Sequence, residues 1–174
     1  MTSSSPNAPT PSDPAGHWEL DPAGTSIEFH TKALWVLPAK GTFKASGGVG
    51  TVAPDGGISG TLVIDAASVD TRNKKRDTHL RTADFFEVEK FPAITFEATG
   101  GRLTGPGTLD LDGTLTVHGE TKPLAVSATL SIEADVATVA AEVEVDRSQW
   151  GLTLRPFGAG LHNRVVVSAR YRKQ

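Results

Sequence analysis

Apolar and polar residues alternate with a period of two along most of the chain from His17 onward. The runs that show this alternation are SIEFHTK, ISGTLVID, AITFEATG, TLDLDGTLTVHG, PLAVSATLSI, VAAEVEVDRS and RVVVSARYR. Such a pattern is typical of β-strands that have one face in an apolar interior and the other in water. The chain is therefore predicted to be an all-β protein.

Turn signals separate these runs at short intervals. They are PDGG at 54–57, the glycines between 100 and 107, and HGETKP at 118–123. This spacing favours an antiparallel meander that closes into a barrel or sandwich over a parallel sheet. The pattern predicts about eight strands, which is near the number at which a closed barrel can hold one small ligand.

One stretch breaks the alternation. Residues 73–86 lose the period of two and are rich in Lys, Arg, Asp and His. A short helix or two fits this stretch, and it must end before Pro92, which permits a strand to begin but not a helix to continue. We expect the charged run to cross one end or side of the barrel.

Four of the seven phenylalanines follow the most polar part of this region, DTRNKKRDTHLR from Asp70 to Arg81: Phe85, Phe86, Phe91 and Phe96. They could anchor the helical insertion on the barrel core, or they could line an apolar cavity in which flat rings pack along a ligand chain. Both roles are compatible. Because the charged run must stay in water while the next segment enters an apolar interior, the junction is expected at the rim of the barrel.

The length of 174 residues is consistent with one domain. Residues 1–16 contain little apolar surface and are expected to form a disordered tail, which leaves 17–174 as the barrel domain. The tail lacks the basic region and apolar core of a secretory signal, and no stretch is apolar for long enough to span a bilayer. We therefore expect a soluble protein that stays in the cytoplasm.

Composition argues against several other functions. The chain has no cysteine, which excludes disulfides and thiolate metal sites, and its net charge of -3 does not suggest a nucleic-acid partner. Its five histidines show no paired metal-ligand spacing, so no metal is expected. Neither a G-x-S-x-G elbow nor a phosphate-binding glycine loop is present, and we predict no catalytic residues.

The cluster Arg76, Asp77, His79 and Arg81 allows three interpretations. A histidine beside a carboxylate can act as a general base, but Asp77 and His79 are two residues apart and do not share a helix face. The favoured interpretation is a capping and salt-bridging cluster that fixes the insertion. A third interpretation places Arg76, His79 and Arg81 at a cavity mouth, where an arginine meets the polar head of a lipid.

Three stretches carry a family resemblance. The sequence VIDAASVDTRNKKRDTHLRTADFFEVEKFPAITFEAT resembles the signature region of the YceI-like family of polyisoprenoid-binding proteins, and LDGTLTVHGETKPLAVSATL and VDRSQWGL resemble later segments of the same family. The resemblance runs in order from about His17 to Tyr171. It implies an extended, eight-stranded, lipocalin-like barrel with a short helical insertion, often in a homodimer. Many relatives carry a signal peptide, whereas this chain begins with a polar, proline-rich tail.

The resemblance also implies a long internal apolar tunnel that holds an isoprenoid or fatty chain. The function predicted is thus binding, storage or transport of a long-chain isoprenoid or other amphiphilic lipid of the quinone or polyprenyl type. No cofactor is required, and the lipid is expected to co-purify. The predicted ligand-binding residues are Ile27, Phe29, Leu34, Trp35, Phe43, Ile64, Phe85, Phe86, Phe96, Ala98, Trp150 and Leu152.

Two alternative functions stay open from the sequence. The barrel could house an enzyme for a small hydrophobic substrate, with His30, His79 or His162 facing inward, which would require a buried histidine and a carboxylate to converge in the cavity. It could also be an interaction module whose barrel is filled by its own side chains. The apolar run around Leu34 and Trp35 could pack in the core or form a flap or dimer surface at the entrance.

Overall fold

Residues 13–33, 39–154 and 159–174 are described by the computed structural model. The strands are β1 (Gly16–Leu20), β2 (Ser26–Ala33), β3 (Ala39–Gly47), β4 (Val49–Val52), β5 (Ile58–Asp70), β6 (Ala93–Gly105), β7 (Thr108–Val117), β8 (Glu120–Glu133), β9 (Val136–Asp146) and β10 (Ala159–Lys173). One α-helix, α1 (Lys74–Leu80), and two short 3-10 helices, η1 (Pro22–Gly24) and η2 (Arg147–Trp150), complete the elements.

Eight of these strands close into an antiparallel barrel. Hydrogen-bonded neighbours follow the order β5-β3-β2-β10-β9-β8-β7-β6, and β6 pairs back onto β5 to complete the ring. The short strands β1 and β4 form a second connection between β10 and β5. The predicted all-β, eight-stranded antiparallel barrel with a helical insertion is confirmed.

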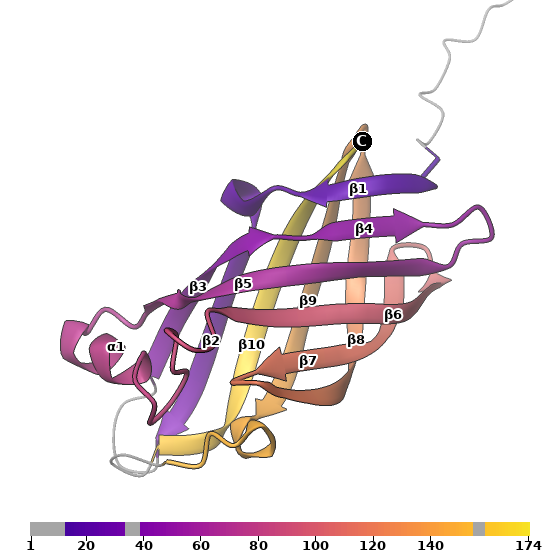
Figure 1. The fold of residues 1–174 in the computed structure, drawn as a ribbon. Helices are drawn as coiled ribbons and strands as arrows, with labels where there is room; N and C mark the ends of the chain where they lie inside the picture. The colour runs from indigo at the N-terminus through magenta and orange to yellow at the C-terminus, as the bar shows by residue number, and fades with distance from the viewer. Residues whose placement is uncertain (1–12, 34–38, 155–158) are drawn as a thin grey trace, which may run out of the picture.

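Two short breaks separate the strands β1 and β4 from the ring strands next to them in sequence. The 3-10 helix η1, which begins at Pro22, separates β1 from β2, and Gly48 separates β3 from β4. At Gly48 a side chain would clash with the Thr61 carbonyl oxygen, so the chain can pass that close to β5 only with glycine. Figure 1 shows the result: β1, β4, β5, β6 and β7 run across β2, β10, β9 and β8, and the barrel has two facing walls.

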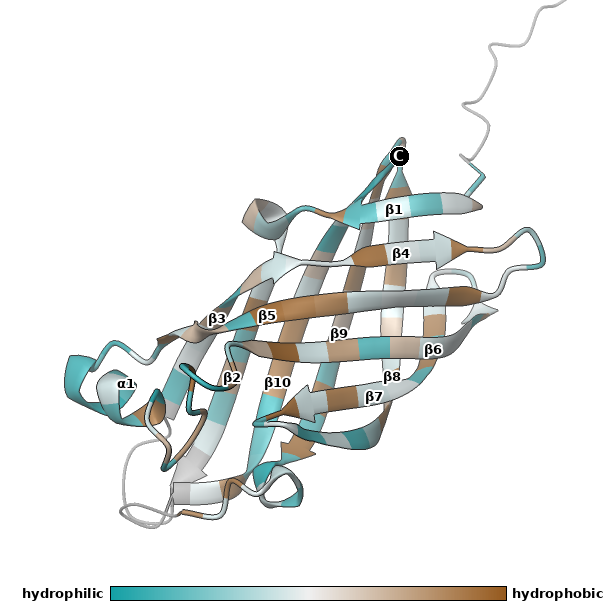
Figure 2. Cartoon of the chain, in the orientation of Figure 1, coloured by the Kyte–Doolittle hydropathy of each residue, from teal (hydrophilic) through white to brown (hydrophobic). Residues whose placement is uncertain are grey.

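The alternation in the sequence sets which side chains face inward. On β7 the predicted apolar positions Leu109, Leu111, Leu115 and Val117 all face the interior. The same holds for the predicted positions of β8, β9 and β10. Figure 2 shows the corresponding patches of hydrophobic colour along the strands, while α1 is mostly hydrophilic.

The insertion between β5 and β6 holds the single α-helix of the described residues. Asn73 caps its N-terminus, where the side-chain Oδ1 accepts a hydrogen bond from the Arg76 amide at 3.0 Å. A series of turns follows the helix as far as Lys90, and β6 begins just after Pro92. The predicted short helix that ends before this proline is confirmed, and it lies at one end of the barrel (Figure 1).

A turn forms within each of the three predicted intervals. The chain turns at 54–57, and His118 and Gly119, both with positive φ, form a tight turn between β7 and β8. The third turn lies at the end of its predicted interval of 100–107, at Pro106 and Gly107. Strand β6 continues to Gly105, and its register against β7 shifts between Ala98 and Gly100, so the glycines at 100 and 101 stay within the strand.

Gly113 offers a test of how closely β6 and β7 are packed. An alanine there would place its Cβ against the Glu97 carbonyl and Ala98 backbone, whereas nothing lies within 4 Å of a Cβ built at Gly47. We expect Gly113→Ala to lower the free energy of unfolding by about 1–3 kcal/mol. Gly47→Ala is the matched control and should be neutral or slightly stabilising. Urea unfolding measures both, and equal midpoints would contradict the packing described.

Candidate functional site

The interior of the barrel is a cavity of about 880 Å³. Side chains from all eight strands of the ring line it, together with residues of α1 and η2. The volume falls in the upper part of the range of about 300–1,000 Å³ that is typical of small-molecule sites. The barrel is therefore hollow, and the alternative of a barrel filled by its own side chains is not what the structure shows.

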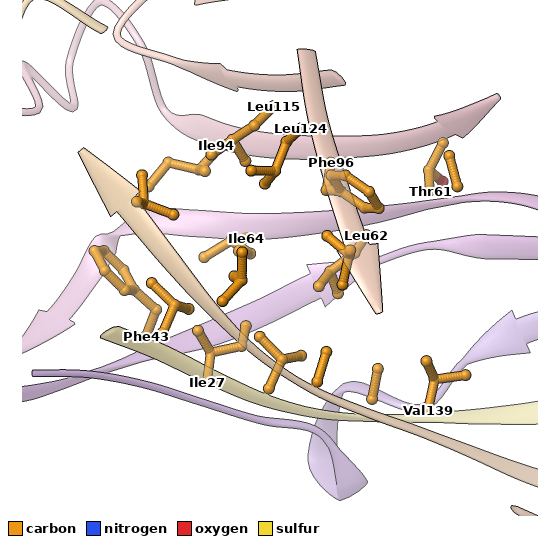
Figure 3. A pocket seen from close by; sticks show the side chains of 18 of the residues that line it. Ile27, Phe43, Thr61, Leu62, Ile64, Ile94, Phe96, Leu115, Leu124 and Val139 are labelled. Atoms are coloured by element: carbon orange, nitrogen blue, oxygen red, sulfur yellow. The ribbon is translucent and has the colours of Figure 1, made fainter. Parts of the chain in front are cut away.

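The wall of the cavity is almost wholly apolar. Figure 3 shows Ile27 and Phe43 on one side and Ile94, Leu115 and Leu124 on another, all pointing into the same space. Thr61 is the labelled side chain in this view that carries an oxygen. Such a surface can receive a hydrocarbon chain, because it presents few groups that water would hydrate better than the ligand does.

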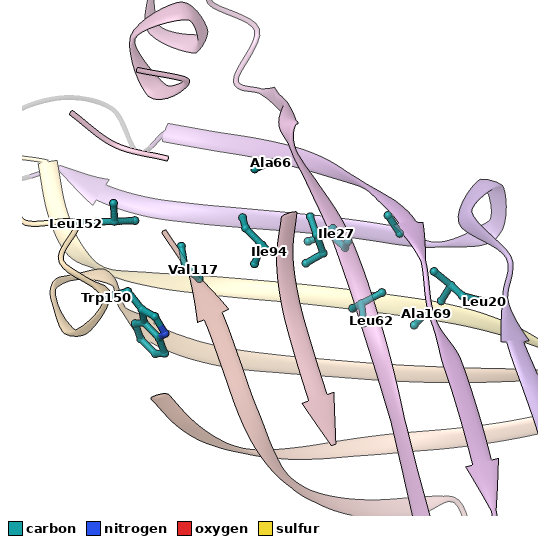
Figure 4. Packing of buried hydrophobic residues seen from close by; sticks show 11 residues of the cluster. Leu20, Ile27, Leu62, Ala66, Ile94, Val117, Trp150, Leu152 and Ala169 are labelled. Atoms are coloured by element: carbon teal, nitrogen blue, oxygen red, sulfur yellow. The ribbon is translucent and has the colours of Figure 1, made fainter. Parts of the chain in front are cut away.

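The buried core of the protein and the cavity wall are largely the same residues. Ile27, Ile64, Ile94 and Trp150 belong to the main buried cluster, and each also lines the cavity. Figure 4 shows this cluster spread along the strands rather than gathered at one centre. The apolar side chains pack against their neighbours within the wall and leave the axis of the barrel empty.

Most of the predicted ligand-binding residues lie in this wall. Those that line the cavity are Ile27, Phe29, Phe43, Ile64, Phe85, Phe86, Phe96, Ala98, Trp150 and Leu152. Leu34 and Trp35, and with them the predicted flap or dimer surface, lie outside the described residues. Of the predicted mouth residues, Arg76 and His79 line the cavity, and Arg81 does not.

The aromatic residues of the insertion divide between the two roles expected of them. Phe86 packs edge-on against Phe43 at 5.5 Å between ring centroids, and Phe43 in turn contacts Phe29 at 5.3 Å, so a row of rings follows the wall. Phe91 is not part of the wall. Its ring lies 4.8 Å from that of His118 and ties the insertion to the turn between β7 and β8.

Asp77 is the polar centre of the insertion. Its buried carboxylate accepts hydrogen bonds from the backbone amide of Thr71, at 3.0 Å, and from the Thr71 hydroxyl. Arg76 donates to the Thr71 hydroxyl from Nε at 2.7 Å and to the Thr71 carbonyl from Nη2 at 2.9 Å. Both side chains thus fasten α1 to the end of β5, in agreement with the capping interpretation of the sequence.

Arg81 has a different position from the one predicted. Its guanidinium donates to the carbonyl oxygens of Ala67, at 2.9 Å, and Val69, at 3.1 Å. These carbonyls belong to the part of β5 where its register with β3 shifts between Asp65 and Asp70, so strand neighbours do not satisfy them. Arg81 is therefore occupied in holding the insertion on β5 rather than in the cavity mouth.

The histidines do not assemble a catalytic group. His30 lies 3.7 Å from Glu28 and, like the exposed His162, is not part of the cavity wall. His79 lines the cavity but pairs with Asp84 at 2.9 Å, a side chain that is 58% exposed. Within the described ranges no carboxylate lines the cavity, and no group of three metal-binding side chains occurs. The arrangement that would favour an enzyme is not found there.

The VDRSQWGL stretch, residues 145–152, ends β9 and forms the 3-10 helix η2. Asp146 caps η2 by accepting hydrogen bonds from the Ser148 hydroxyl and amide, and these bonds lower the pKa of its carboxyl. Gly151 ends the turn with a φ of 78°. Between them Trp150 points inward, and its indole Nε1 donates to the Leu115 carbonyl at 2.8 Å.

Tyr171 is a wall residue that the sequence analysis did not select. Its hydroxyl donates to the Thr61 carbonyl at 3.1 Å, and burial raises the pKa of its phenol to about 12. The inward positions of β8, β9 and β10 were also missed, as were Lys75 and Arg147. The alternation had marked these strand positions as apolar. The pattern along the chain does not show that every strand of the ring contributes to the cavity wall.

Comparison with known proteins places this architecture in a family. The profile of the YceI-like domain matches residues 18–172. The chain belongs to the YceI-like domain family. The resemblance seen in the sequence is thereby confirmed.

Curated relatives share parts of the YceI-like domain. A UPF0312 protein of Ectopseudomonas mendocina is 46% identical over 68 residues, which is 39% of this chain and 36% of that protein. Protein YceI of Salmonella arizonae is 35% identical over 125 residues, or 70% of this chain and 65% of that protein. These matches cover less than two thirds of the length of the relatives.

Solved structures share the fold at low identity. The Burkholderia cenocepacia protein BcnA superposes with a TM-score of 0.76 and 19% identity over 87% of this chain and 98% of that one. A polyisoprenoid binding domain from Saccharophagus degradans gives 0.72 and 18% over 90% and 98%. Both show the YceI-like barrel. Among the described helices of this chain, none is long and apolar enough to cross a membrane.

The Asp77 contacts predict a large difference between two carboxylates of the insertion. Asp77→Asn removes an acceptor and a charge from a buried site, and we expect it to lower the free energy of unfolding by about 1–3 kcal/mol. Asp84→Asn disrupts an exposed ion pair with His79 and should cost less than about 1 kcal/mol. Urea denaturation of the two variants compares them. Equal losses would show that Asp77 does not hold the insertion.

The raised pKa of Tyr171 predicts a loss of stability at high pH. Since the folded pKa of about 12 lies above the ordinary value of 10.0, the protonated phenol stabilises the fold fully below pH 10.0, and this contribution disappears as the pH rises towards 12. Tyr171 is the only tyrosine, so phenolate absorbance follows it directly. Tyr171→Phe should abolish this part of the pH dependence. A phenol that titrates at its ordinary pKa would contradict the burial.

Proposed function

We propose that this chain binds a long-chain isoprenoid or another amphiphilic lipid inside its barrel and thereby stores or transports it. The observation that carries the proposal is the hollow core. The cavity of about 880 Å³ is bounded by apolar side chains of all eight ring strands. Within the described residues no carboxylate lines it, and no group of three metal-binding side chains occurs.

The affinity of such a site would come from burial of the ligand chain. Each buried methylene contributes about 0.8 kcal/mol, so a long hydrocarbon gains a large gross free energy without polar recognition. Immobilising the ligand costs roughly 4–15 kcal/mol, and only the surplus is measured as binding. A short ligand would therefore bind weakly, and a long chain is the occupant that this wall favours.

The comparisons support the chemical class of the ligand. One solved structure with the same fold is described as a polyisoprenoid binding domain, and its resemblance covers nine tenths of this chain. The row of rings formed by Phe29, Phe43 and Phe86 offers flat surfaces against which a methyl-branched chain can pack. An isoprenoid of the quinone or polyprenyl type is thus the ligand that we propose first.

A larger side chain that fills the cavity tests whether this space binds a ligand or only contributes to stability. Ala98 lines the wall, whereas Ala125 on β8 faces the solvent. Ala98→Phe should occupy space that the ligand needs and reduce binding of a long prenyl alcohol at least about tenfold, because a ring replaces several methylene contacts. Ala125→Phe makes the same chemical change outside and should bind normally. Fluorescent-probe displacement measures affinity, and thermal melting reports the fold.

The outcome separates a ligand cavity from an ordinary core. If the cavity is a binding site, Ala98→Phe melts close to the unsubstituted protein and loses its ligand. If Ala98→Phe melts early, as overpacked cores do at a cost of about 1–3 kcal/mol, and solvent extraction of the unsubstituted protein releases no lipid, the proposal is wrong. The proposed homodimer and cytoplasmic location stay predictions, which sedimentation and cell fractionation can test.

A further inference from the structure

The charged side chains that line the cavity share one sign. Apart from the Tyr171 phenol, the ionisable groups of the described wall are Lys75, Arg76, His79 and Arg147. All four are basic, and no carboxylate in the described part of the chain lines the cavity with them. Since the chain as a whole carries a net charge of -3, this selection does not follow from composition.

The basic residues also meet at one end of the cavity. Lys75, Arg76 and His79 belong to α1, and Arg147 belongs to η2. Phe85 connects the two elements: the His79 ring packs perpendicular to it at 5.2 Å, and the Arg147 guanidinium lies 5.9 Å from its centroid. We call these four residues the basic rim.

Three of the four residues have polar partners nearby, and Arg147 donates to the carbonyl oxygens of Leu152 and Gly160. Asp84 is exposed and pairs with His79, and Asp77 is buried beneath Thr71. Asp146 lies beside Arg147 and caps η2 through Ser148. Lys75, in contrast, makes no hydrogen bond or ion pair with the described residues, so its ammonium is available to a ligand.

Arg76 is held in a fixed orientation at the same rim. Its Nε and Nη2 donate to Thr71, and Thr71 is itself held by Asp77. These contacts are made with a hydroxyl and a carbonyl, and no carboxylate of the described residues forms an ion pair with Arg76, so its position is fixed by uncharged groups. A planar, pre-oriented guanidinium is well suited to a carboxylate or a phosphate.

We propose that the ligand of the cavity carries an anionic head, a carboxylate or a phosphate, which the basic rim holds while the apolar chain lies along the barrel. The inference rests on the proposed function and narrows it: a quinone head is neutral, so within the proposed lipids the rim would favour polyprenyl phosphates and fatty acids over quinones. Burial of hydrocarbon has no direction, so it cannot decide which end of the ligand enters first. Charge at one end supplies that orientation and discriminates against neutral and cationic amphiphiles of the same length.

The direct test compares ligands that differ only in the head. A neutral naphthylamine dye is displaced from the full-length protein by hexadecanoic acid, hexadecanol and a hexadecyl trimethylammonium salt, and in a second arm by geranylgeranyl phosphate and geranylgeraniol. We expect each anion to bind about tenfold more tightly than its alcohol, and the ammonium salt to bind most weakly. The arm with the larger preference identifies carboxylate or phosphate as the head.

Two adjacent lysines provide a matched pair of variants. Lys75 lines the cavity and Lys74, one residue earlier on α1, does not. Lys75→Gln should weaken binding of the anions about threefold to fivefold and leave the alcohols unchanged. Lys74→Gln changes the net charge equally and should stay within about 1.5-fold for every ligand. Arg76→Gln should give a larger loss for the anions, with alcohol affinity as the internal control for its fold.

The outcomes distinguish this inference from the function on which it rests. Equal affinity for acid, alcohol and ammonium, with the dye still bound, overturns the anionic head and leaves lipid binding intact. Equal losses in Lys74→Gln and Lys75→Gln also overturn it, because the effect would then come from overall charge. Failure of the dye and of every ligand to bind would instead refute the proposed function itself.

Discussion

The closure of β6 onto β5 is the constraint on which the rest of the structure depends. Eight strands joined in a ring give every inward side chain the same destination, and a ring of this size leaves space that medium-sized residues do not fill. The protein therefore buries its apolar residues in a shell. Stability comes from contacts between neighbours along the wall, and the empty axis follows from the strand number and the modest size of residues such as Ala98 and Ala169.

The insertion places a polar helix next to the apolar opening of the barrel. Asp77, Thr71 and Arg76 form a hydrogen-bonded unit that fixes α1 to the end of β5, and Arg81 satisfies carbonyls that the sheet leaves unpaired. Phe85 and Phe86 can then turn into the cavity. The polar side chains hold the backbone of the insertion in place, and in this position the two rings form part of the cavity wall.

The sequence predicted the strands well because their alternation is a local property. Ile27 and Phe29, or Leu115 and Val117, reveal which face is dry without any knowledge of their partners. The prediction did not locate the turn within 100–107, because the glycines at 100 and 101 look like a turn and yet lie in a long strand beside a bulge. A bulge depends on the register of the neighbouring strand, which one segment does not contain.

The candidate site was predictable only in part for a similar reason. Most of the apolar residues chosen from the sequence line the cavity, since the dry parity and the wall coincide. Arg81 was misplaced, and Lys75, Arg147 and Tyr171 were missed, because their positions depend on how α1, η2 and β10 meet in space. Residues far apart in the chain reach the same opening, and no spacing along the sequence records that meeting.

The hollow core links the lifetime of this protein to its cargo. A molecule that binds the folded state and not the unfolded chain raises the free energy of unfolding by mass action, and here the bound chain would occupy the place that a solid protein gives to its own side chains. Loaded and empty molecules should then differ in how often they open to proteases. Under the proposed function, the supply of lipid would set how much of the protein a cell retains. The amount of protein would then reflect the amount of available lipid.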